Sequence, residues 1–179
     1  HLDDAFNLVQ KALATCPDYA QALTLRGILS LQKGDTKSAQ PDLEKAVELD
    51  YSDTTSFIAL ASLYNTEGKF DDAFKVLDHG MSMHPESWQG WMETARAQIG
   101  RRHYDDALKA LARGDRYFPS DNTHIYLLRA QAFIGTRNYP AAISQLEAFL
   151  GKERSGPNVD IAQKTLAHLK TAVVQEAQK

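Results

Sequence analysis

The chain has 179 residues, of which 43% are hydrophobic, so it is long enough to bury a core. Its 20 Lys and Arg residues nearly balance 23 Asp and Glu residues, which leaves a formal charge of -3 at pH 7. So small a charge does not attract nucleic acid or an anionic lipid surface, and we exclude polyanion-binding proteins as a class. No apolar run approaches the roughly 20 residues that a membrane-spanning helix needs, so we predict no membrane insertion.

The start of the sequence leaves the cellular compartment open. Residues His1 to Asp4 lack the basic and apolar stretches of a signal peptide, and they lie inside an expected helix. Two kinds of protein fit this start: a cytoplasmic one, and a periplasmic or secreted one whose signal sequence and first repeats have been removed. Cys16 is the single cysteine, which excludes an internal disulfide and a multi-cysteine metal site.

Small residues recur along the chain with a fixed period. One column returns every 34 or 35 residues and consists of Ala5, Ala39, Ala73, Ala107 and Ala142. A second column, seven residues further on, has the same steps and consists of Ala12, Ala46, Gly80, Gly114 and Phe149. Two columns in register indicate an array of repeats, each of which buries its apolar face by stacking on its neighbours.

Each repeat is predicted to be two helices joined by a tight turn. Apolar residues at i, i+3, i+4 and i+7, as in the run from Phe57 to Tyr64, indicate helices and leave no place for strands. Units end at Pro17, Pro85 and Pro119, because proline lacks a backbone donor and clashes with the preceding turn. Glycine can end a helix by adopting the left-handed backbone conformation. Glycines that stand at or near the turn before a second helix are Gly34, Gly68, Gly100 and Gly135.

These markers give the expected position of every helix. First helices are expected at about 20–33, 54–67, 88–100 and 123–136. Second helices are expected at about 3–15, 37–50, 71–83, 105–117 and 140–151. Arg26 and Arg129 stand in first helices where an apolar residue is usual, and we expect their stems to pack while their heads reach water or a carboxylate.

The repeat pattern resembles the tetratricopeptide repeat family over residues 2–151. The resemblance is clearest in the run from Phe57 to Tyr64, followed by the run from Gly68 to Ala73. It implies an all-α fold, a right-handed superhelical solenoid of antiparallel helix pairs with about 4.5 units. We expect the array in residues 1–157, with units at about 1–19, 20–53, 54–87, 88–122 and 123–157.

The two ends of the array differ. After a polar linker, residues 158–179 are predicted to form a capping helix whose apolar stripe runs from Ile161 through Leu166 and Leu169. At the other end, helix 3–15 has no first-helix partner, so we expect Leu2, Phe6 and Leu13 to lie partly exposed. Two alternatives would cover this edge: upstream residues of a longer chain, or a second copy of the chain.

The sequence carries no recognisable catalytic or metal-binding motif. Phosphate-binding glycine loops, the nucleophile elbow and the His-Glu-x-x-His zinc motif are missing. Paired acids at 3–4, 71–72 and 105–106 recur at the start of the second helix in three of the five units, where they interact favourably with the helix dipole. His79 and His84 are five residues apart, whereas zinc ligands on a helix are four apart. We predict no catalytic residue, no metal and no cofactor.

The family resemblance implies that the first helices line a concave groove that binds a partner. The residues expected there are Gln21, Thr24, Ile28, Thr55, Ile58, Ser62, Asn65, Gln89, Met92, Glu93, Arg96, His124, Leu127 and Gln131. The same faces are completed by Leu25, Leu31, Ala59, Ile99, Leu128 and Ile134. Trp88, at the start of the third unit, has two readings: a rim contact for a partner, or a cover for the loop.

One subset of the family clamps the terminal carboxylate of chaperone tails with lysine, asparagine and arginine. The matching positions here carry Thr24, Ile28, Ala59, Gln89 and Glu93, so we predict no such clamp. The leading hypothesis is a non-enzymatic scaffold that binds a peptide or helix of a partner protein in the groove. Two alternatives stay open: a targeting or assembly arm of a larger enzyme or of a secretion or cell-envelope machine, and a self-association module.

Overall fold

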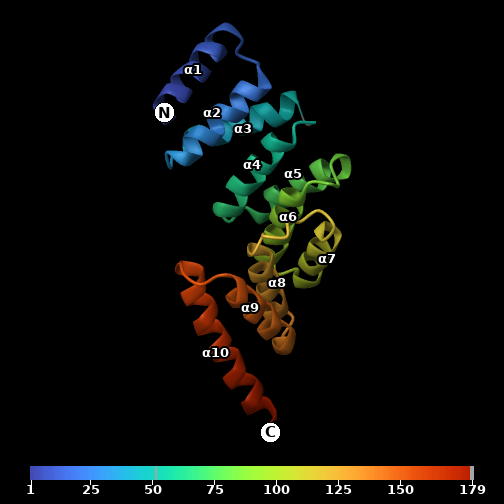
Figure 1. Ribbon diagram of the computed structural model, residues 1–179. Coiled ribbons are helices and arrows are strands. Elements are labelled where there is room, and N and C mark those ends of the chain that lie inside the picture. The colour runs from blue at the N-terminus through green and yellow to red at the C-terminus, as the bar shows by residue number, and fades with distance from the viewer. Residues whose placement is uncertain (51, 178–179) are drawn as a thin grey trace.

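The computed structural model describes residues 1–50 and 52–177, and within these ranges the chain forms ten α-helices and no β-strand. In chain order the helices are α1 (Leu2–Thr15), α2 (Ala20–Gln32), α3 (Thr36–Leu49), α4 (Thr54–Thr66), α5 (Phe70–Met83), α6 (Trp88–Gly100), α7 (Tyr104–Gly114), α8 (His124–Gly135), α9 (Tyr139–Lys152) and α10 (Pro157–Ala177). They stack from one end of an elongated molecule to the other (Figure 1). The predicted all-α superhelical solenoid is confirmed.

The helices lie in two layers. Helices α2, α4, α6 and α8 contact one another in turn, and each also packs against the second helices on either side. In the described part of the chain, the second helices α3, α5 and α7 make no comparable contact with one another. In a curved stack, neighbouring helices lie closer together on the inner side than on the outer side. The first helices therefore form the inner face of the solenoid, and the second helices form the outer face.

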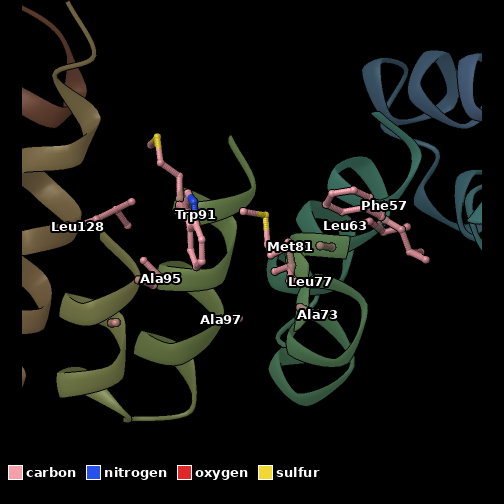
Figure 2. Close-up of a cluster of buried hydrophobic side chains, with 14 of the residues drawn as sticks. Phe57, Leu63, Ala73, Leu77, Met81, Trp91, Ala95, Ala97 and Leu128 are labelled. Atoms are coloured by element: carbon pink, nitrogen blue, oxygen red, sulfur yellow. The ribbon is translucent and has the colours of Figure 1, made fainter. Parts of the chain in front are cut away.

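Small residues set the distance between the layers. Ala39, Ala73 and Ala107 are fully buried. A Cβ built on Gly80 would lie 2.7 Å from the ring of Phe57, which is itself fully buried, so the two helices approach to glycine distance there. Larger side chains then fill the surrounding space, as Phe57 and Leu77 do in the cluster of Figure 2.

The turns inside the units use two kinds of residue. Gly34 and Gly68 have φ of 78° and 74°, as predicted for a left-handed helix end. In the next two units Arg102 and Arg137 adopt this conformation, with φ of 63° and 59°. The expectation for Gly100 and Gly135 was therefore wrong: these glycines are the last residues of α6 and α8. The rings of Phe70 and Tyr104 pack directly on Gly100 and Gly135. A Cβ added to either glycine would lie 2.3 Å from the ring, so only glycine fits at these positions without a shift.

Charged side chains join helices within the stack. Arg26 donates from Nε and Nη2 to the two carboxylate oxygens of Asp42, at 2.6 Å each. This hydrogen bonding raises the pKa of Arg26 above its ordinary value. Arg129 pairs with Asp115, so both unusual arginines reach a carboxylate, as predicted. The paired acids lie in the first turns of α1, α5 and α7, where the prediction put them.

Helix α7 ends three residues earlier than predicted, at Gly114 rather than 117. The amides of Tyr117 and Phe118 both donate to the carbonyl of Gly114, which closes a turn at the helix end. That turn brings the ring of Phe118 over Gly114, within 2.6 Å of a built Cβ. The low helix propensity of Gly114 and the packing of Phe118 on it both favour this early stop.

Both ends of the array differ in detail from the expectation. Helix α10 buries Val159, Ala162 and Leu169 against α9, and Leu166 packs against the same cluster. The predicted stripe is therefore right at Leu166 and Leu169 and wrong at Ile161, which is 63% exposed. Positions 178–179 of the predicted capping helix lie outside the described residues. In α1, Leu2 is exposed as expected, but Leu13 is buried because it packs against α2. Self-association through α1 and the division into units stay predictions.

Among the described residues, no helix has both the length and the apolar character that crossing a bilayer requires.

We predict that Gly80→Ala lowers the free energy of unfolding by about 1–3 kcal/mol, because the added methyl forces Phe57 out of its packed position. Gly151→Ala is the matched control: a Cβ there has no neighbour within 4 Å, so helix propensity alone raises stability, by about 0.5–1 kcal/mol. Urea unfolding followed by circular dichroism measures both. A Gly80→Ala variant as stable as the parent would contradict the close approach.

Candidate functional site

A hollow of about 530 Å³ lies on the inner face of the solenoid, between α2, α4 and α6. Its lining consists of Ile28, Leu31, Thr54, Thr55, Ile58, Ala59, Ser62, Trp88, Gln89, Met92 and Glu93. Three successive units contribute to it, so the site exists only because the units stack.

Helical spacing explains why these side chains converge. Thr55, Ile58 and Ser62 are at i, i+3 and i+7 on α4, so they form one stripe along that helix. The opposite side of α4 carries Phe57 and Leu60, which are buried against the second helices. The helix thus has an apolar core side and a mixed side that faces the hollow.

The hollow brings together half of the predicted groove residues. These are Ile28, Thr55, Ile58, Ser62, Gln89, Met92 and Glu93. Leu31 and Ala59 lie there too, and Trp88 is part of the wall. Thr54 was not predicted, although its position four residues before Ile58 puts it on the same helix stripe.

The other predicted groove residues lie elsewhere. Thr24 is buried, and its hydroxyl donates to the carbonyl of Ala20 at 3.0 Å, so it completes its own helix. Gln21 and Gln131 are exposed and do not line the hollow. His124 lines a separate small hollow of about 140 Å³ beside the loop between α9 and α10, and Leu127 packs against the core around that end.

A buried carboxylate marks one end of the hollow. The side-chain nitrogen of Asn65 donates to the Glu93 carbonyl at 3.0 Å and to its Oε2 at 2.8 Å. Arg96 donates from Nη1 to the other carboxylate oxygen at 2.5 Å. Asn65 and Arg96 therefore contribute by orienting Glu93, since neither lines the hollow.

The hollow has almost no charge. Helix α4, from Thr54 to Thr66, contains no Asp, Glu, Lys or Arg. Among the lining residues Glu93 alone is ionisable, and Arg96 neutralises it. The surface offered to a ligand is therefore aliphatic and aromatic, with hydroxyl and amide groups from Thr55, Ser62 and Gln89.

The described side chains hold no group of three or more His, Cys, Asp or Glu residues arranged to bind a metal ion.

We predict that Asn65 and Glu93 are energetically coupled. Removing the Asn65 amide leaves a buried carboxylate oxygen without its donor, so Asn65→Ala and Glu93→Ala together cost less than the sum of the two. A double-mutant cycle on the free energy of unfolding is expected to give a coupling of about 1 kcal/mol. Additive effects of the two substitutions would mean that the contact contributes nothing.

Comparison with known proteins agrees with the helical repeat architecture. Models of the tetratricopeptide repeat family match residues 20–53 and 64–132, which together make up more than half of the chain. The BBSome complex member BBS4 of Bos taurus is 28% identical over 130 residues, covering 71% of this chain and 24% of that protein. The chain thus spans about a quarter of the length of this relative.

Solved structures share the fold at low identity. A chain of the APC/C hetero-tetramer Cut9-Hcn1 superposes with a TM-score of 0.81 at 15% identity, over 94% of this chain and 33% of that one. YrrB, described as a TPR protein with an unusual peptide-binding site, gives 0.73 at 17% identity, over 91% and 84% of the two chains. Repeat period, two-layer helix stacking and family match agree, and the chain belongs to the tetratricopeptide repeat family.

Proposed function

We propose that the chain is a non-enzymatic scaffold that holds an apolar helix or extended segment of a partner protein in the inner-face hollow. The tetratricopeptide repeat fold is in general a protein-interaction scaffold. The observation that carries the finer proposal is the nearly uncharged hollow of about 530 Å³ across three units. Concave, mainly apolar sites with a few polar groups are typical of binding sites.

The chemistry of the lining supports this class of partner. Ile28, Ile58 and Met92 come from three different helices and offer apolar contacts along the hollow. Thr55, Ser62 and Gln89 stand among them with hydroxyl and amide groups that fix the position of a bound backbone. Burial of apolar side chains then supplies affinity, and these polar groups supply register.

The lining argues against recognition of a terminal carboxylate. A carboxylate clamp needs cationic side chains, and no Lys or Arg is among the residues that line the hollow. Thr24, at one of the matching positions, is buried and bonded to its own helix. We therefore propose recognition of an internal segment of a partner chain.

A second candidate is that these repeats form the assembly arm of a larger protein. The observation that favours it is that the chain spans about a quarter of BBS4, which is itself a member of a complex. The full open reading frame distinguishes the two candidates, because an arm is continuous with further domains.

We predict that Ile58→Glu and Ile28→Glu, which both change residues that line the hollow, each abolish capture of the partner from a lysate of the source organism. An unpaired charge in an apolar contact costs several-fold to a hundredfold in affinity. Leu49→Glu is the control, since Leu49 is 46% exposed on α3 in the outer layer. Circular dichroism checks that all three variants fold. Identical captured proteins from all variants would refute binding in the hollow.

We also predict that partner binding depends little on salt. Binding by apolar burial is insensitive to ionic strength, whereas a clamp of exposed charges weakens as the screening length falls from about 10 Å at 0.1 M to about 3 Å at 1 M. Calorimetric titration of the captured partner across this range measures the effect. A loss of affinity of more than about tenfold would indicate charge-based recognition.

A further inference from the structure

A second hollow, of about 410 Å³, lies on the outer face between α5 and α7, with α6 as its floor. Its α6 residues are Trp91, Thr94 and Gln98, which share one stripe at i, i+3 and i+7. At about 100° per residue, this stripe is on the opposite side of α6 from Gln89 and Met92 in the inner hollow. The two hollows are therefore separate surfaces of one helix.

At the same place in the first full unit (residues 20–53, called here the first unit), an ion pair crosses the floor of the hollow. An equivalent hollow of about 350 Å³ lies between α1 and α3, and its residues are the counterparts, two repeats earlier, of those in the third unit. There Arg26 and Asp42 meet across the floor at 2.6 Å. In the third unit these two positions are Thr94 and Ala110, too short to meet. The second unit has Leu60 and Val76 there, both packed on the core.

The rim of the hollow also differs in charge between the first and third units. In the first unit Lys45 pairs with Asp18 at 2.5 Å. The counterparts in the third unit are Arg113 and Glu86, but Glu86 lies against His84 at 3.3 Å. Within the described residues Arg113 has no carboxylate partner, and its guanidinium carbon is 5.9 Å from the centre of the Trp91 ring. This side of the hollow therefore carries an unneutralised positive charge.

An amide side chain lines the same hollow. Gln98 is 6% exposed, and its Oε1 accepts a hydrogen bond from Arg101 at 3.2 Å. Its side-chain nitrogen has no acceptor in the described part of the chain, although the residue lines the hollow. The side-chain nitrogen of Gln98 is therefore available to donate to an acceptor that a ligand supplies in the hollow.

We propose that the outer hollow is a second docking site, for an acidic segment of a partner protein. An aliphatic or aromatic side chain enters between Leu77, Trp91 and Thr94, in the space that the Arg26 side chain fills in the first unit. A neighbouring Asp or Glu carboxylate pairs with Arg113, and a backbone carbonyl accepts from Gln98. This proposal does not depend on what the inner hollow binds.

The geometry limits the length of the segment and its direction. Asp106 and Arg113 are seven residues apart on α7, so the wall is about 10 Å long, or about three residues of extended chain. Asp106 is neutralised by Lys109 at 2.8 Å. Asp78 on the α5 wall has no cationic partner among the described residues, so it repels an acid on that side. The carboxylate of the segment therefore lies on the α7 side.

The test uses the first unit as a template. Thr94→Arg/Ala110→Asp reproduces the Arg26–Asp42 pair in the third unit, so that an ion pair occupies the floor position that the apolar side chain of the ligand would take. A phage-displayed library of random linear peptides is selected on the parent chain and depleted on this double variant. We expect the enriched peptides to carry an acidic residue beside an apolar one. A synthetic peptide of this set is expected to lose at least about tenfold in affinity on the double variant.

Three further variants keep the result decisive. Arg113→Glu changes an exposed residue and is expected to lower the affinity for the acidic peptide by a similar factor. A peptide in which lysine replaces the acidic residue is expected to bind this variant again. Ile58→Glu and Leu49→Glu leave the affinity unchanged, which separates this site from the inner hollow. Enrichment of basic peptides, failure to enrich any peptide, or binding that survives both Thr94→Arg/Ala110→Asp and Arg113→Glu would overturn the proposal.

Discussion

The close approach of helices at small residues is the constraint on which the rest of the structure depends. Gly80 lets the ring of Phe57 lie where a methyl group would stand, and Gly114, one unit later, is packed in the same way by Phe118 and Trp91. Helices that touch at these points leave defined spaces on either side, which larger side chains fill or leave open. Both hollows are therefore products of where the small residues stand.

Periodicity predicted the helices and the buried side of most of them, because a column that returns every unit reports a shared environment. Rotation of a helix about its axis was harder to predict. Thr24 and Ile28 belong to one helix, yet the Thr24 hydroxyl turns to its own backbone. Ile161 and Ala162 are adjacent in the chain, and the fit of α10 against α9 decides which of them is buried.

The site was predicted in part for the same reason. Ile58 and Met92 converge because their helices are neighbours in the inner layer, which the family resemblance implied. The outer hollow depends on α5 and α7, which are not adjacent in the chain and are held apart by α6. Its signal was nevertheless present in the sequence: the positions of Arg26 and Asp42 carry Thr94 and Ala110 two repeats later.

The two-layer arrangement has a mechanical consequence. Inner helices touch one another, whereas outer helices are separated, so bending occurs mainly by changing the gaps on the outer side. Tighter curvature narrows the inner hollow and widens the outer one, and straightening does the reverse. Because α6 contributes residues to both hollows, the shapes of the two depend on the curvature of a single stack.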